Sequence, residues 1–216
     1  MAVADPGTTC IIVFARAVQP GAAKTRLIPL LGAEGAAALH ARMVKHALAT
    51  ARKAGLGAVE LHCTPTSDDD FFRFCGDRYR AALVTQAAGD LGARMAAAAS
   101  AALAVHARVL LIGSDCPALT ARHLRQANQA LIDKAAAVFV PAEDGGYVLL
   151  GLTRSDQRLF QGIAWGSDTV LADTRACLRE LGWPWHELET LWDVDGPEDY
   201  QRLIESKLLD EHAATR

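Results

Sequence analysis

Short apolar runs alternate with amphipathic, alanine-rich stretches along the chain. The apolar runs contain many β-branched residues, which is typical of strands buried on both faces of a sheet. We expect strands at 9–14, 58–63, 82–85, 108–112, 136–142 and 148–152, and an edge strand at 184–188.

Between these runs, apolar residues recur at the spacing of an α-helix. Helices are expected at 34–53, after Ser67, at 93–107, 120–134 and 165–181, and from Pro197 onward. The residues that favour these bounds are the N-cap candidates Ser67, Thr120, Ser167 and Asp195 or Gly196, and the helix-ending Gly55 and Gly182. Three acids follow Ser67, and a first helical turn favours acids, so a helix start is preferred to a metal site there.

This alternation predicts one sheet with helices on both faces. Asp144-Gly145 between two apolar runs is a hairpin signal, which would add antiparallel pairing. The prediction is a single-domain, three-layer α/β/α fold, Rossmann-like, with a mixed, mostly parallel sheet in residues 1–209 and a polar tail at 210–216.

Composition removes several classes of function. A net charge of −3 gives no basic field for nucleic acid, and no signal peptide or apolar span points to a membrane, so a cytoplasmic protein is expected. Five scattered cysteines and seven dispersed histidines show neither a disulfide framework nor zinc spacing. Cys116 stays open as a nucleophile that lacks a histidine base, and the alanine-rich helices leave open a homodimer.

Asp115 is the first acid after the run 108–112. In open α/β sheets ligands bind beyond the carboxyl ends of the strands, where this carboxylate would project. A turn cap before Pro117 is the alternative role. Asp144 is likewise a turn residue or a second carboxylate over the same crevice, and Asp193 is an acid that the expected helix start leaves unexplained.

The loop 15–29 is the second candidate element. No acid occurs from Pro6 to Ala33, whereas Arg16, Lys24 and Arg26 all do. Lys24 and Arg26 would face the same way in an extended segment. The loop is therefore interpreted as an anion site, with a solvated surface loop as the alternative.

Five segments occur in a specific order: Ile12–Leu27 (IVFARAVQPGAAKTRL), Gly113–Pro117 (GSDCP), Pro141–Tyr147 (PAEDGGY), Trp165–Asp168 (WGSD) and Asp193–Asp199 (DVDGPED). Together they resemble the GT-A-like transferases associated with radical-SAM and selenoprotein domains, a family of the nucleotide-diphospho-sugar transferase superfamily. They are also similar to the guanylyltransferases of molybdenum-cofactor and phospholactate metabolism. The resemblance covers nearly the whole chain.

The resemblance implies a GT-A fold and a metal-dependent transferase with a nucleoside triphosphate or nucleotide sugar as donor and a small phosphorylated or hydroxylated acceptor. Phosphoryl transfer mainly requires a metal and cations that hold phosphates, which suits this residue set. The implied site comprises Lys24, Arg26 and Asp115 as catalytic residues; Phe14, Ala15, Arg16, Lys24, Arg26 and Ser114 at the nucleotide; Glu143, Asp144, Gly145 and Gly146 at the acceptor; and Asp115, Asp144 and Asp193 at Mg²⁺ or Mn²⁺.

Two departures from the superfamily pattern bear on the reaction. The segment 15–21 has one glycine where sugar nucleotidyltransferases carry G-x-G-T-R, and Asp115 has no Asp-x-Asp partner. A single acid favours nucleotidyl transfer over glycosyl transfer from a nucleotide sugar. A non-catalytic nucleotide-binding protein of the same fold is the third alternative.

Overall fold

The computed structural model describes residues 5–209, so the predicted tail at 210–216 lies outside the described part. One seven-stranded sheet forms its centre, in the order β3-β2-β1-β4-β6-β5-β7. The strands are β1 Asp5–Arg16, β2 Gly57–Thr64, β3 Ala82–Thr85, β4 His106–Ile112, β5 Ala137–Pro141, β6 Tyr147–Leu152 and β7 Trp185–Glu187. β6 pairs antiparallel with β4 and β5, and the other pairs are parallel, which confirms the mixed, mostly parallel sheet.

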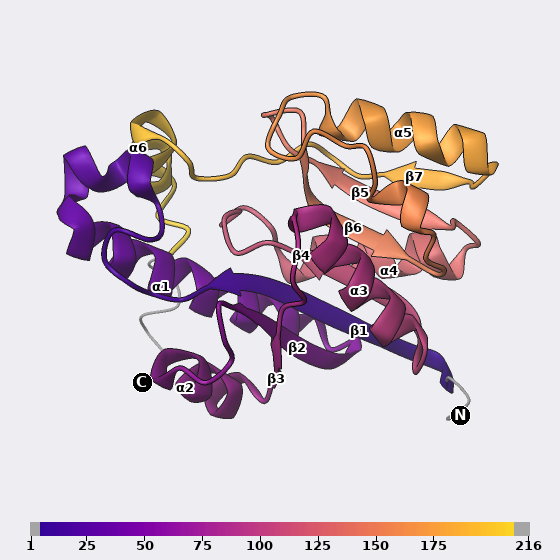
Figure 1. The fold of residues 1–216 in the computed structure, drawn as a ribbon, viewed down its shortest axis with the longest axis horizontal. Helices are drawn as coiled ribbons and strands as arrows, with labels where there is room; N and C mark the ends of the chain where they lie inside the picture. Colours follow the sequence, from indigo (N-terminus) through magenta and orange to yellow (C-terminus); the bar gives the residue numbers. More distant parts are fainter. Residues whose placement is uncertain (1–4, 210–216) are drawn as a thin grey trace.

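Helices cover both faces of this sheet, as Figure 1 shows. They are α1 Ile28–Ala54, α2 Asp70–Tyr79, α3 Leu91–Leu103, α4 Ala121–Ile132, α5 Val170–Leu181 and α6 Pro197–Ser206, with short 3-10 turns at Thr25–Leu27 and Gln157–Leu159. Side chains from α1, α2 and α4 pack in one core with one set of strand residues. Side chains from α3 and α5 pack in another with the alternate set. The chain is therefore a single-domain, three-layer α/β/α protein.

The central strand β1 explains this layering. Ile11 and Val13 belong to the core under α1, α2 and α4, whereas Cys10 and Ile12 belong to the opposite core. Successive side chains of a strand point to opposite faces, so a continuous apolar run fills both. β1 pairs with β2 on one side and β4 on the other, which places its carboxyl end at the middle of the sheet edge.

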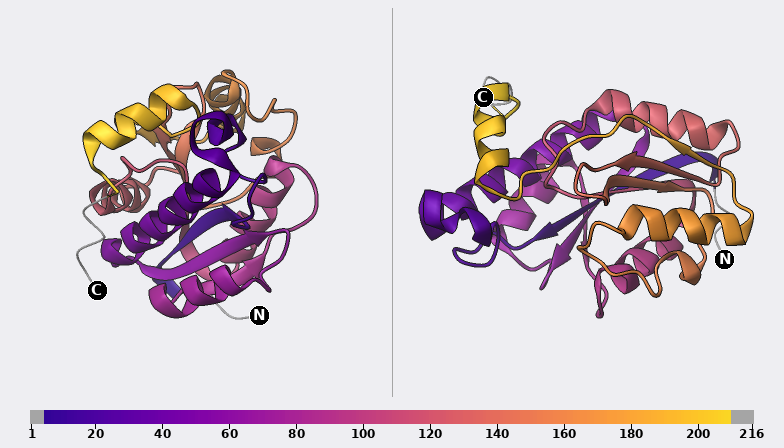
Figure 2. Two further views of the ribbon diagram at one scale, coloured as in Figure 1. Left: turned by 90° about the vertical axis from the view of Figure 1, so that its left-hand side faces the viewer. Right: turned by 90° about the horizontal axis from the view of Figure 1, so that it is seen from above.

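The last helix, α6, packs away from the sheet. Leu203 of α6 shares a third core with Trp192 and Val194, and with Leu39 and Met43 of α1. Figure 2 shows α6 beside the amino-terminal part of α1. The segment that precedes α6 is consequently held over the carboxyl ends of the strands. Within residues 5–209, no helix combines the length and apolar character needed to cross a membrane.

Three predicted helix bounds are wrong. α1 begins at Ile28 and bends at Gly32, where φ is 69°, so a turn of helix precedes the expected start at residue 34. α3 spans Leu91–Leu103 because β4 begins at His106 and takes the residues expected at its end. α5 begins at Val170, and Ser167 does not cap it.

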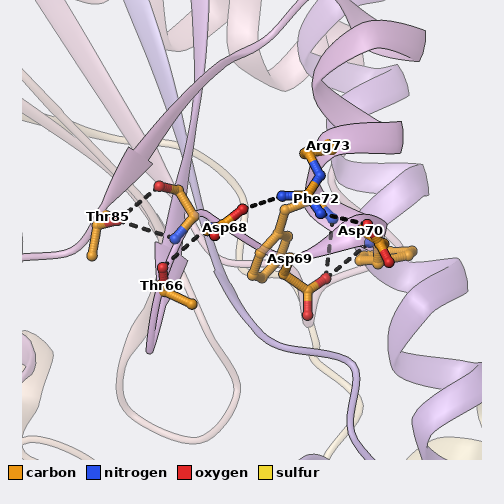
Figure 3. Close-up of polar contacts among 9 residues, drawn as sticks. Thr66, Asp68, Asp69, Asp70, Phe72, Arg73 and Thr85 are labelled. Carbon is orange, nitrogen blue, oxygen red and sulfur yellow. Dashed lines mark hydrogen bonds and ion pairs between the residues drawn. The ribbon is translucent and has the colours of Figure 1, made fainter.

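The N-cap of α2 is Asp69 and not Ser67 (Figure 3). The Asp69 carboxylate accepts hydrogen bonds from two amides of the first turn, and the Ser67 hydroxyl lies 2.8 Å from the Thr85 hydroxyl. The aspartates on either side of Asp69 pair with Arg73. All three acids thus have structural partners, which agrees with the preference for a helix start over a metal site.

Candidate functional site

The predicted site residues converge at the carboxyl ends of β1 and β4. Lys24 lies in the loop after β1, Asp115 follows β4, and Asp144 lies in the turn between β5 and β6. The segment 191–195 passes over all three loops, because the amide of Glu143 donates to the carbonyl of residue 191 and the amide of Val194 donates to the carbonyl of Asp115 at 2.9 Å. Loops distant in sequence therefore form one surface.

Lys24 connects these loops. Its side chain is only 6% exposed, and Nζ lies 2.8 Å from Asp115 Oδ1 and 3.5 Å from Asp195 Oδ1. Nζ also donates to the Val194 carbonyl oxygen at 2.6 Å. Asp115 is 45% exposed, so its carboxylate still faces solvent. A buried ammonium is suited to hold a phosphate by charge-assisted hydrogen bonds, and the solvated carboxylate beside it offsets its charge.

The expectation of an extended segment from Lys24 to Arg26 is wrong. Lys24 has left-handed backbone angles, φ 51° and ψ 42°, and the short 3-10 turn follows. Arg26 is 76% exposed, and Nη1 lies 3.5 Å from Asp195 Oδ2. The two cations still approach the same aspartate, one buried and one in solvent.

A cavity of about 440 Å³ opens above these residues. Four basic side chains line it: Arg16, Lys24, Arg26 and Arg94. Arg94 of α3 is fixed in place, since Nη1 donates to Gln86 Oε1 at 3.2 Å. We refer to this space as the cationic cavity. Its charge and position match an anion site at the strand ends.

The remaining residues predicted at the nucleotide also line the cationic cavity. They are Phe14, Ala15 and Ser114. Ser114 is buried, and its hydroxyl donates to Asp115 Oδ1 at 3.5 Å. His40 of α1 lines the same space; burial lowers its pKa, and its Nε2 lies 2.9 Å from the Arg16 carbonyl oxygen.

The aspartates gather around Asp193. Burial, and then the charges of Asp144, Asp195 and Asp115, raise the pKa of Asp193 from 3.8 to about 6. Four carboxylates therefore lie near one another and form a region of concentrated negative charge. Lys24 and Arg26 offset part of it from one side. Such a set of oxygen donors suits Mg²⁺ or Mn²⁺.

Asp193 and Asp144 also line a second cavity, of about 230 Å³. Its other walls include Phe14, Tyr147 and Trp165, with the Trp165 ring edge-on to Tyr147 at a centroid distance of 6.5 Å. We refer to it as the acidic aromatic cavity. Phe14 lines both cavities, so the two spaces are neighbours.

The predicted acceptor residues occupy different positions. Asp144 and Gly146 line the acidic aromatic cavity, and Asp144 Oδ1 accepts the Gly146 amide at 2.9 Å. Gly145 has φ 88°, and a Cβ there would collide with the carbonyl of Asp168. Glu143 is exposed and pairs with Arg202 of α6, with Nη1 to Oε2 at 2.8 Å. The turn therefore directs Asp144 toward the cavity and Glu143 toward α6.

Two other groups bear on the predicted chemistry. Burial raises the pKa of the Cys116 thiol to about 12, so the thiolate that a nucleophile requires is scarce at neutral pH. In the described residues, ligand atoms of Cys10, Glu60 and His106 lie within 4.8 Å of one another and form a potential metal-binding group. These three residues lie in the amino-terminal halves of β1, β2 and β4, away from the carboxyl ends of the strands, where Asp115 lies. A thiol, imidazole and carboxylate set suits zinc better than Mg²⁺, so it is distinct from the predicted site.

Sequence reasoning missed three residues of this surface. Asp195 was explained fully by the helix start, yet it contacts both Lys24 and Arg26. Its spacing from Asp193, two residues along an extended segment, was the available signal. Arg94 carries no sequence signal for a binding site, because it is one basic residue in an alanine-rich helix whose expected role is packing. Trp165 was assigned to a helix, but it precedes α5 and lines the second cavity.

Fold and site together define the class of the protein: a three-layer α/β protein with two neighbouring cavities at the carboxyl ends of its strands. The chain belongs to the family described as uncharacterized protein conserved in bacteria (DUF2064), which matches residues 47–167. That range includes Asp115 and Asp144, whereas Lys24 and Asp193 lie outside it. No curated protein matches the chain in sequence.

Solved structures share the fold over most of the chain. A protein provisionally described as a nucleotide-diphospho-sugar transferase from Desulfovibrio desulfuricans G20 is 28% identical, with a TM-score of 0.84 and 95% of each chain covered. The 4-diphosphocytidyl-2C-methyl-D-erythritol synthase of Anaerococcus prevotii DSM 20548 is 11% identical, with a TM-score of 0.60 over 92% of this chain and 97% of that one. Glucosyl-3-phosphoglycerate synthase of Mycobacterium tuberculosis, in complex with Mn²⁺, UDP and glucosyl-3-phosphoglycerate, is 9% identical, with a TM-score of 0.54 over 94% and 77%.

Proposed function

We propose that the chain is a metal-dependent transferase that binds a nucleoside triphosphate in the cationic cavity and transfers its nucleotidyl group to a small acceptor. The observation that carries the proposal is the buried Lys24 ammonium between Asp115 and Asp195, on the wall of a cavity with three arginines. Phosphates and a divalent cation are the ligands that these opposite charges accommodate together.

Asp115 and Asp193 are the proposed metal ligands, whereas Asp144, the third predicted ligand, lines the acceptor side and is proposed to meet the acceptor hydroxyl. Mg²⁺ commonly binds through one or two carboxylates and the phosphates of the substrate, so a full cage of protein ligands is not required. When bound, the metal would neutralise charge on the phosphates. The residues fit this role because Asp193 is partly buried beside other carboxylates: burial first, and then the charges of Asp144, Asp195 and Asp115, raise its pKa.

The remaining steps follow from the two cavities. Lys24 and Arg94 would hold the phosphates, and the acceptor would enter from the acidic aromatic cavity. The acceptor oxygen bonds to the α-phosphorus, the bond from that phosphorus to the bridging oxygen breaks, and pyrophosphate leaves. Asp144 is placed to receive the proton of an acceptor hydroxyl, because its carboxylate lines the acceptor side.

Glycosyl transfer from a nucleotide sugar is the second candidate. It is favoured by the similarity to the Desulfovibrio protein, the solved structure above with 28% identity. In this reaction the acceptor oxygen bonds to the anomeric carbon, and a nucleoside diphosphate leaves. The same cations and carboxylates would serve both reactions, so the leaving group distinguishes them.

Thermal shift measurements over nucleoside triphosphates and nucleotide sugars, each with Mg²⁺, Mn²⁺ or EDTA, test the proposal. A ligand at one hundred times its Kd stabilises the native state by about 2.7 kcal/mol, which is readily measured. Metal-dependent stabilisation by a triphosphate, lost in Asp115→Asn, is expected. Stabilisation by nucleotide sugars alone, with release of nucleoside diphosphate, would replace nucleotidyl by glycosyl transfer. Metal-independent binding without any product would leave a nucleotide-binding protein that is not an enzyme.

Two narrower predictions accompany the proposal. The association with radical-SAM and selenoprotein domains would be tested by the genes adjacent to this one. A homodimer through the alanine-rich helices would be tested by sedimentation velocity.

A further inference from the structure

The two neighbouring cavities have opposite charge. Every lysine and arginine that lines either space belongs to the cationic cavity, among the residues that the structure describes. The charged residues of the acidic aromatic cavity are Asp144 and Asp193. In the metal-free protein a ligand that carries a phosphate would meet two carboxylates there and no lysine or arginine, although charged groups require a partner when they leave water. With a divalent ion at Asp115 and Asp193, shared with the donor phosphates, the Asp144 carboxylate would still oppose such a ligand.

The nearest basic side chain of α3 does not offset this charge. Arg94 lies on the same helix as Met95, which lines the acidic aromatic cavity. Its Nε, however, donates to the Gly89 carbonyl at 3.1 Å and to the Asp90 carbonyl at 3.2 Å, and Nη1 donates to Gln86. These three hydrogen bonds hold the guanidinium at the cationic cavity, where the nucleotide donor is proposed to bind.

Aromatic side chains form one part of the cavity wall, beside aliphatic residues such as Met95 and Leu150. The Tyr147 ring is tilted by 39° from the buried Phe139 ring, with the centroids 5.4 Å apart, and it lies perpendicular to Trp165. Trp165 lies directly against the first turn of α3, because a Cβ added at Gly92 would collide with its indole nitrogen. A rigid aromatic surface of this kind binds the apolar face of a ligand by stacking.

We propose that the acidic aromatic cavity selects an acceptor alcohol that carries no phosphate, either neutral or positively charged, whose apolar face stacks on Trp165 while a hydroxyl meets Asp144. This inference rests on the proposed transferase function and narrows it. It removes the phosphorylated acceptors that the sequence left open. A neutral sugar or an aromatic alcohol has the required chemistry, because such molecules combine hydroxyl groups with an apolar face.

A matched probe pair tests the inference: phenyl β-D-glucopyranoside and its 6-phosphate. Binding to the full chain is measured by titration calorimetry and by saturation-transfer NMR, without nucleotide and with Mn²⁺ plus the nucleotide that stabilises the protein most. The neutral probe is expected to bind at least tenfold more tightly than the phosphate. Asp144→Lys should reduce or reverse this preference, whereas Asp144→Asn keeps the shape of the turn and should reduce it less.

A tryptophan variant separates stacking from charge. Trp165→Leu should weaken the neutral probe about tenfold, and Trp183→Leu, which alters a half-buried tryptophan outside both cavities, should leave it unchanged. Equal or tighter binding of the phosphate by the wild type, or binding of neither probe, overturns the inference. If the neutral probe binds but no nucleotide stabilises the chain, the proposed function fails and the cavity assignment stands.

Discussion

Replacement of Asp193 by asparagine should stabilise the metal-free protein while it weakens metal binding. The pKa of this half-buried carboxyl is about 6 in the folded chain, against an ordinary value of 3.8. A raised pKa means that the folded state favours the protonated form. The carboxyl therefore costs no stability below pH 3.8, and its cost grows as the pH rises from 3.8 to about 6 and is complete above that.

The size of the effect follows from the shift. Each pKa unit corresponds to about 1.4 kcal/mol, so the ionised Asp193 costs at most about 3 kcal/mol at pH 7. Partial exposure to water reduces this to about 1–2 kcal/mol. For a chain of this length, each kcal/mol changes Tm by about 2–4 °C, so Asp193→Asn should raise Tm by about 2–8 °C at pH 7.

Thermal melts in EDTA and in Mn²⁺, at pH 4.5 and pH 7, check this reasoning. The gain in EDTA should largely disappear at pH 4.5, where wild-type Asp193 is protonated. Mn²⁺ should stabilise the wild type more than the variant at pH 7, because the metal requires the carboxylate. Asp77→Asn, at an exposed position on α2, is the matched control and should leave the stabilisation by Mn²⁺ unchanged. A variant that is no more stable than wild type at pH 7, or equally stabilised by Mn²⁺, refutes the assignment.

Three further substitutions have defined outcomes. Lys24→Met should lower Tm by several degrees, because a charged hydrogen bond to the carbonyl of residue 194 is worth about 1.5–3 kcal/mol. It should also weaken triphosphate binding at least tenfold, as measured by calorimetry. Unchanged affinity in the folded variant would make Lys24 purely structural. Gly145→Ala should destabilise the chain and reduce binding of the neutral probe, since the added methyl meets the neighbouring backbone; a wild-type Tm would contradict the observed packing. Asp69→Ala should lower the free energy of unfolding, measured in urea, by about 0.5–2 kcal/mol through loss of the α2 cap, and Ser67→Ala should lower it less. The reverse ranking would restore Ser67 as the cap.

The sequence predicted those features that depend on neighbouring residues. The strand before Asp115 and the hairpin at Asp144 were recognisable because apolar runs and turn residues carry local information. The shared fold with nucleotide-diphospho-sugar transferases confirms the predicted architecture. Helix starts were less predictable: Ser67 and Asp69 are both good caps, and only the position of the β2 to α2 connection decides between them.

Features that depend on distant contacts could not be read in this way. Asp195 has a sufficient local explanation at the start of α6, and its contact with Lys24 appears only after the chain has folded. Glu143 and Asp144 are both acids in the turn after a predicted strand, so the sequence does not distinguish them. In the structure, Glu143 pairs with Arg202 and is directed away from the cavities. The opposite charges of the two cavities likewise depend on which loops come together in the fold, and the sequence of a single loop does not reveal this.

The bond from Lys24 to the carbonyl of Val194 also constrains the order of events during synthesis. It joins residues separated by 170 positions, so it cannot form until nearly all of the described chain has left the ribosome. The sheet strands β1 to β4 can pair well before that point, because their contacts lie within the first 112 residues. A nascent chain that has reached β4 can thus form part of the sheet before Lys24 can contact residue 194. The proposed nucleotide binding would therefore require the later segments as well, and an assay of it would report their folding.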